Sequence, residues 1–173
     1  MEKELKVGIL MGSDSDLEVM SEVAKVLEEF GVAYYITVAS AHRSGELVHE
    51  LVDNAKALGI KVLIGGAGGA AHLAGVMASL TTLPVIGVPV KAKTLDGLDS
   101  LLSTVGMPPG IPVPTVGINA AKNAGHLAVQ ILATSDNDLE EKLIAYKNKM
   151  ADDIKSKSEK LLKVGYKDYL KGM

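Results

Sequence analysis

The stretch KVGILMGSDSD, residues 6–16, decides the fold because it joins a buried strand to a polar turn. Lys6–Met11 is an almost continuous apolar run, which is typical of a parallel strand covered on both faces. Ser13–Asp16 supplies small polar side chains of the kind that begin helices. From Leu17 onward apolar residues recur with a helical period until Gly31, which predicts a helix that ends at this glycine.

The same alternation of strand, turn and helix continues outward from this stretch. Further strands are predicted at Ala33–Ala39, Lys61–Ile64, Pro84–Val90 and Pro112–Ile118. Further helices are predicted at Leu47–Leu58, His72–Leu80, Leu95–Val105 and Ala120–Ala133. Five strands that alternate with five helices through short loops predict an α/β fold, namely a flavodoxin-like, three-layer, doubly wound parallel five-stranded sheet.

The C-terminal segment differs from the rest of the chain. Asp138–Lys171 is rich in lysine and acidic residues and carries only a sparse apolar stripe. The predicted core is complete without this segment, and an amphipathic helix with no place in its own core often packs on a neighbouring subunit. The alternative is that it lies along its own domain. We predict a catalytic domain at 1–135 and a helical arm at 136–173 that packs on neighbouring subunits.

Composition excludes several classes of function. A net charge of −3 gives no electrostatic reason to expect a nucleic-acid partner, and one Phe, five Tyr and no Trp argue against base stacking. The absence of cysteine excludes disulfides and thiolate metal sites. Apolar runs are too short for a membrane span, and the N-terminus leads directly into a strand without room for a signal peptide. We therefore expect a cytoplasmic protein with no membrane partner.

Functional residues are expected where the strands end, because open parallel sheets bind ligands at the carboxyl ends of their strands. These ends are Gly12–Asp16, Ser40–Gly45, Gly65–Gly75, Pro89–Asp96 and Asn119–Asn123. The unusual residues of the chain gather in these loops. They predict one ligand site at this edge of the sheet.

The first two loops suit an anionic ligand and a proton transfer. The hydroxyls of Ser13 and Ser15, beside free N–H groups at a helix start, suit a phosphate monoester, although plain helix capping is the alternative. Asp16 could accept hydrogen bonds from ribose hydroxyls. Histidine is a side chain that can exchange a proton with a substrate, which makes His42 a candidate for this role, and Arg43 could hold a phosphate or carboxylate. A solvated turn is the alternative for this pair.

The third loop is the densest glycine cluster, and it includes Gly68, Gly69 and Ala70. Small residues let the backbone approach a flat or anionic group closely. The cluster is neither a P-loop nor a dinucleotide-binding pattern. His72 is either a ligand contact or a helix cap, and no cluster has the spacing of metal ligands.

Five motifs in order carry a resemblance to a known family: Gly12–Asp16, Ser40–Arg43, Gly66–Leu73, Gly87–Val90 and Gly97–Ser103. On these motifs the chain closely resembles the N5-carboxyaminoimidazole ribonucleotide mutase family of purine biosynthesis. The resemblance runs from about Lys6 to Leu132, and the helical tail also fits. It implies a homo-octamer that acts on a small-molecule ribonucleotide without cofactor or metal.

The resemblance also implies residue roles. The carboxylate on the exocyclic nitrogen of the substrate moves to carbon 4 of the imidazole, and His42 transfers the proton. Ser13 and Arg43 are expected near the phosphate and Asp16 on the ribose. The carboxylate and the trapped carbon dioxide are expected beside Ser40 and a backbone stretch that includes Gly68, Gly69, Ala70, His72 and Leu73.

Some positions depart from the family pattern and keep other functions open. Ser44-Gly45 stands where the family has Thr-Pro, Ala74 replaces a proline and Gly106 replaces a glutamine. These changes leave loop closure and substrate choice open. The rivals are a direct aminoimidazole ribonucleotide carboxylase, a carboxylase of a nicotinate-type mononucleotide, and a non-catalytic nucleotide-binding module of the same fold. The direct carboxylases have a different glycine loop, with Arg-Ser-Asn where this chain has Gly69-Ala70-Ala71.

Overall fold

The computed structural model describes residues 4–173 and centres on a parallel sheet. Its strands are β1 (Val7–Met11), β2 (Tyr34–Val38), β3 (Val62–Gly68) and β4 (Val85–Val90), in the order β2-β1-β3-β4. All neighbouring strands pair in parallel. The α/β fold with a parallel sheet is thus confirmed, and the order agrees with the first four strands of a flavodoxin-like sheet.

The prediction of a fifth strand at Pro112–Ile118 is wrong, and the sheet of the described residues has four strands. Thr115 forms only an isolated bridge with Gly87, whose N–H donates to Pro114 O at 2.9 Å. The next bonds of a parallel ladder on either side would need N–H groups from Pro114 and Pro89. Proline has no N–H, so the ladder stops after one bridge.

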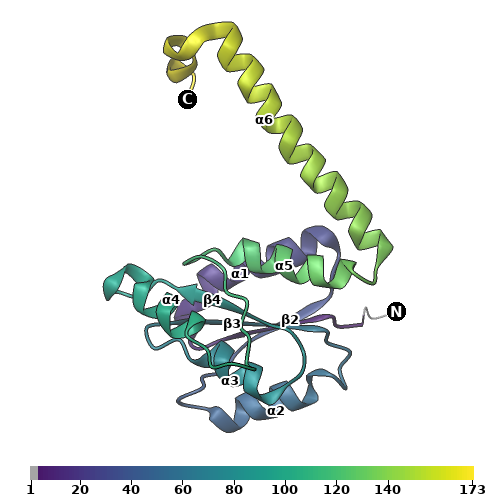
Figure 1. Cartoon of the computed structure of the whole chain (residues 1–173), viewed down its shortest axis with the longest axis vertical. Coiled ribbons are helices and arrows are strands. Elements are labelled where there is room, and N and C mark those ends of the chain that lie inside the picture. The colour runs from purple at the N-terminus through teal and green to yellow at the C-terminus, as the bar shows by residue number, and fades with distance from the viewer. Residues whose placement is uncertain (1–3) are drawn as a thin grey trace. The chain divides into compact units, whose positions relative to one another are not determined.

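Helices cover both faces of the sheet, as Figure 1 shows. Helices α1 (Leu17–Phe30) and α5 (Ala121–Ala133) lie on one face, and α2 (Gly45–Ala55) and α3 (Leu73–Leu80) lie on the other. Consecutive residues of β3 meet the two layers in turn, because Met77 of α3 lies against Gly65 and Met20 of α1 lies against Gly66. This alternation produces the predicted three layers.

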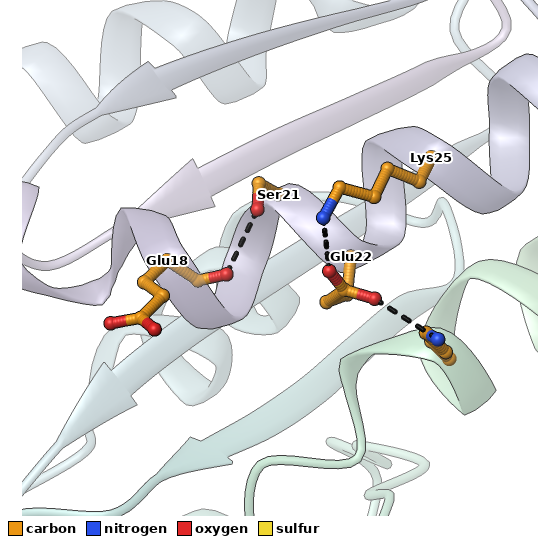
Figure 2. Close-up of polar contacts among 5 residues, drawn as sticks. Glu18, Ser21, Glu22 and Lys25 are labelled. Atoms are coloured by element: carbon orange, nitrogen blue, oxygen red, sulfur yellow. Dashed lines mark hydrogen bonds and ion pairs between the residues drawn. The ribbon is translucent and has the colours of Figure 1, made fainter.

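The outer surface of α1 carries polar contacts that reach α5. Figure 2 shows Glu22 paired with Lys25, and Ser21 Oγ donating to the carbonyl oxygen of Glu18 at 2.8 Å. Glu22 also lies 3.2 Å from Lys122 Nζ on α5, and these lysines hold the pKa of Glu22 below its usual value. Exposed ion pairs contribute little to stability, so the two helices depend mainly on close packing.

Gly125→Ala should destabilise this packing. A Cβ at position 125 would lie 2.8 Å from Val26 Cβ of α1. Overpacking of this kind costs about 1–3 kcal/mol, which outweighs the roughly 1 kcal/mol that alanine gains over glycine within a helix. Thermal melting should show a lower transition for this variant. The control Gly45→Ala, where a Cβ meets no atom within 4 Å, should melt no lower than wild type. A higher transition for Gly125→Ala would contradict the close approach.

The predicted helix at Leu95–Val105 is correct in its second part only. Helix α4 (Leu98–Val105) follows a 3-10 turn, η2 (Leu95–Gly97), in which Leu95 and Asp96 have φ values of 51° and 52°. The apolar residues whose spacing predicts this helix are not its buried face. Ser100 is fully buried, whereas 47% of Leu98 and 60% of Leu102 is exposed.

The chain divides into two compact units, of which the second is Ala133–Met173. This unit is dominated by α6 (Asn137–Lys171), so the tail is helical as predicted. Asp136 caps it by accepting a hydrogen bond from Leu139 N at 3.1 Å, and Gly165 interrupts it with a φ of 74°. Its exposed apolar residues include Ile144, Met150, Ile154, Leu161 and Leu162. Within residues 4–173 no helix is both long and apolar enough to cross a membrane.

Candidate active site

The residues that the sequence singled out meet around one cavity of about 480 Å³. The cavity lies where β1, β2, β3 and β4 end. Its lining includes Ser13, Ser15, Asp16, Ser40, His42, Arg43, Gly68, Gly69, Ala70, His72 and Leu73. The structure therefore brings together every site residue that the sequence predicted, although their roles stay predictions. The loop Asn119–Asn123 does not line the cavity, but Asn119 Oδ1 accepts a hydrogen bond from Lys91 N at 2.8 Å.

The loop after β1 is a capping box that also lines the cavity. Ser13 Oγ accepts a hydrogen bond from Ser15 N at 3.3 Å, and Asp16 Oδ2 accepts one from Ser13 N at 3.1 Å. Helix capping is thus real here, and it fixes the Ser13 hydroxyl at the cavity wall. Asp16 is 7% exposed, and its burial raises the pKa of its carboxyl, against the opposing effects of the Ser13 N–H and the nearby Arg43.

Asp16→Asn should change how stability depends on pH. Because the pKa of Asp16 is raised in the folded protein, the folded chain binds more protons than the unfolded chain just above pH 3.8. The unfolding free energy contributed by this group therefore falls as pH rises through that window. The amide of the variant keeps an oxygen for Ser13 N–H and carries no charge. We expect the variant to gain stability relative to wild type between acid and neutral pH, measured by melting temperature. Parallel pH curves for the two proteins would refute this account.

Arg43 joins the loops after β1 and β2. Its Nη2 donates to the carbonyl oxygen of Gly12 at 2.7 Å, and its Nε lies 3.4 Å from Ser40 Oγ. Arg43 is the only arginine in the sequence. These bonds hold the guanidinium at the cavity wall, and among residues 4–173 its Nη1 group donates to no protein atom. The remaining donors suit a phosphate or carboxylate.

His42 and His72 meet across the cavity although 30 positions separate them. His42 Nε2 lies 2.8 Å from His72 Nδ1, and the two rings are nearly perpendicular. A hydrogen bond between ring nitrogens needs one N–H and one lone pair, so only one of these two atoms carries a proton at a time. His72 is the N-cap residue that precedes α3, but its side chain makes no capping bond. The side chain therefore does not cap the helix but lines the cavity, and its contact with a ligand stays a prediction.

Helix α4 holds the glycine loop that follows β3 through two hydrogen bonds. Strand β3 extends four residues beyond the predicted end at Ile64, and Gly69 then takes a φ of 67°, which favours glycine. Gly69 N donates to Ser100 Oγ at 2.8 Å, and Ala71 N donates to Ser103 Oγ at 3.0 Å. No role was predicted for these two serines. The signal that could have found them is a pair of hydroxyls one helical turn apart.

Two lysines of the loop after β4 also line the cavity and were not predicted individually. Lys91 Nζ pairs with Asp96 at 2.8 Å, whereas Lys93 has no ion pair among the described residues. Lys93 therefore adds positive charge to the cavity wall, whereas Asp96 offsets the charge of Lys91. Across residues 4–173 no group of three or more His, Asp or Glu side chains is placed to hold a metal ion.

Comparisons with known proteins agree on one family. The model of the AIR carboxylase family matches residues 6–153. An N5-carboxyaminoimidazole ribonucleotide mutase of Pyrococcus abyssi is 58% identical over 96% of this chain and 96% of that protein. One of Thermotoga maritima is 55% identical over 95% of this chain and 96% of that protein. The crystal structure of Treponema denticola PurE superimposes with a TM-score of 0.83 at 31% identity, covering 90% of this chain and 97% of that chain.

Proposed function

The chain belongs to the AIR carboxylase family, and we propose that it is an N5-carboxyaminoimidazole ribonucleotide mutase, an isomerase of purine biosynthesis. The observation that carries this proposal is the 55–58% identity to proteins of that name over nearly their whole length. The reaction moves a carboxylate from the exocyclic nitrogen of the aminoimidazole to carbon 4 of the ring.

The proposed reaction moves one proton from His42 to the substrate and returns one proton from the substrate to His42. The bond between nitrogen and carboxylate breaks, carbon dioxide is released into the cavity, and the nitrogen takes a proton from His42. Carbon 4 then bonds to the carbon dioxide and gives its proton back to His42, so that no net proton is consumed. The contact with His72 supports this role, because a hydrogen bond between the two ring nitrogens orients the His42 ring in the cavity.

The other lining residues are proposed to hold the substrate. Arg43, Ser13 and Ser15 bind the phosphate through the free guanidinium donors and the hydroxyls. Asp16 binds the ribose hydroxyls. Ser40 and the backbone of Gly68–Leu73 enclose the carboxylate, because small residues leave room for carbon dioxide and exclude water.

A homo-octamer in the cytoplasm is part of the proposal, with residues 1–135 as the catalytic domain and 136–173 as an arm on neighbouring subunits. The exposed apolar residues of α6 support the arm, since such a stripe suits contact with another chain. A phosphorylated substrate that does not cross membranes favours the cytoplasm. Sedimentation equilibrium should give eight times the mass of one chain.

The test of the function is a comparison of two substrates. Purified protein should isomerise N5-carboxyaminoimidazole ribonucleotide without ATP, bicarbonate or added metal. A direct aminoimidazole ribonucleotide carboxylase is the second candidate, because the matching family model carries that description. Conversion of aminoimidazole ribonucleotide and carbon dioxide alone would select the second candidate. If neither substrate is converted, both candidate functions are rejected.

A further inference from the structure

Helix α4 buries hydroxyls and exposes leucines, the reverse of an ordinary surface helix. Ser100 and Thr104 are buried, whereas about half of the surface of Leu98 and Leu102 is exposed. Exposing leucines forgoes hydrophobic stabilisation, and a buried hydroxyl is tolerated only where it is hydrogen-bonded. The contacts of these hydroxyls therefore explain why the helix faces this way.

Two of the hydroxyls tie α4 to the glycine loop. Ser100 Oγ accepts the N–H of Gly69 at 2.8 Å and donates to the carbonyl oxygen of Val90 at 2.7 Å. Ser103 lies one turn further on the same face. Its Oγ accepts the N–H of Ala71 at 3.0 Å and donates to the carbonyl oxygen of Asp99 at 2.7 Å.

The tied backbone leads directly to the reacting groups. Gly69 and Val90 both line the cavity, and Ala71 is followed by His72, whose ring contacts His42. Residues 69–72 form no regular secondary structure, so the serines supply partners that a sheet or helix would otherwise supply. A shift of this segment would move the cavity wall and the His72 ring together.

We propose that Ser100 and Ser103 are positioning residues that hold the Gly69–Ala71 backbone, and through it His72, for the carboxylate transfer. The inference rests on the proposed function. Ser13, Asp16 and Arg43 come from other loops, so the serines affect the reacting end of the substrate more than its phosphate end. Loss of either hydroxyl leaves a partly buried N–H of the loop without its partner and lets the loop shift.

Four variants test this role. Ser100→Ala and Ser103→Ala remove one anchor each, and Ser103→Thr keeps the hydroxyl at the half-buried position. Thr104→Val is the matched control. Thr104 is as buried as Ser100, but its hydroxyl donates within its own helix to Ser100 O at 2.7 Å. Its distance of 3.5 Å to Ala71 O is too long for a strong bond.

The expected result separates positioning from general stability. Each alanine variant should lose roughly 10- to 100-fold in kcat, as small displacements of reacting groups do, with KM within about threefold of wild type. Ser103→Thr should recover most of the kcat, and Thr104→Val should keep it. Amide hydrogen exchange should become faster in the peptide that covers residues 66–72 of the alanine variants, and stay unchanged there in Thr104→Val.

Either readout can overturn the inference. Unchanged exchange at residues 66–72, or wild-type kcat in both alanine variants, would remove the serines from this role. An equal loss of kcat in Thr104→Val would show that the loss in the alanine variants arises from disturbed helix packing. Because exchange is measured without substrate, an inactive wild-type protein would overturn the proposed function and leave the anchoring to be decided by exchange alone.

Discussion

His42→Asn should lower turnover by about 100-fold or more, because asparagine cannot carry the proton that the reaction moves. The His42 side chain is exposed in the cavity, so its loss creates no void in the core. We therefore expect the variant to keep the melting temperature and subunit assembly of wild type. The measurement is steady-state isomerisation at saturating substrate, together with thermal melting.

The matched control for this prediction is His49→Asn. His49 is exposed on α2 and does not line the cavity. The His49→Asn variant should keep wild-type turnover. This result would show that the loss of turnover in His42→Asn depends on the site rather than on losing any histidine. Turnover of His42→Asn close to wild type would remove His42 from its proposed role and leave the His42–His72 contact without a function.

Arg43→Ala should raise the Michaelis constant by roughly 10- to 100-fold, the effect of losing a charge-assisted phosphate contact. Arg43→Lys should recover only part of this loss, because an ammonium keeps the charge but cannot bridge Gly12 and Ser40 as the guanidinium does. An unchanged Michaelis constant in Arg43→Ala would contradict the placement of the phosphate.

The single arginine allows an independent check on the wild-type protein. Arg43 is the only guanidinium in this sequence that an arginine reagent such as phenylglyoxal can modify. Modification of one residue per chain should abolish substrate binding, and saturating substrate should protect against it. Full activity after complete modification would contradict the role of Arg43 as firmly as the alanine variant.

The four strands and the cavity edge were predictable because their signals are local. Continuous apolar runs mark parallel strands that are buried on both faces, and parallel strands bring their carboxyl ends to one edge of the sheet. This reasoning was enough to gather Ser13, His42 and Gly68 in one site. The fifth strand failed because pairing depends on both partners, and Pro89 on β4 removes a donor that Pro112–Ile118 cannot replace.

The face of α4 could not be predicted from periodicity alone. A helical period identifies one apolar face without saying that this face is buried. Here the burial is decided by the N–H groups of Gly69 and Ala71, which are distant in sequence and donate to the hydroxyls of Ser100 and Ser103. The contact between His42 and His72 was missed for the same reason, since it depends on the relative positions of two loops.

The most direct test of the central claim follows the carboxylate itself. The substrate would carry an isotopic label in its carboxylate carbon, and the reaction would run in buffer saturated with unlabelled carbon dioxide. If the cavity holds the released carbon dioxide until carbon 4 captures it, the product should retain the label in full. A product that has exchanged its carboxylate with the buffer would contradict the transfer within a closed cavity and identify a carboxylase that takes carbon dioxide from solution.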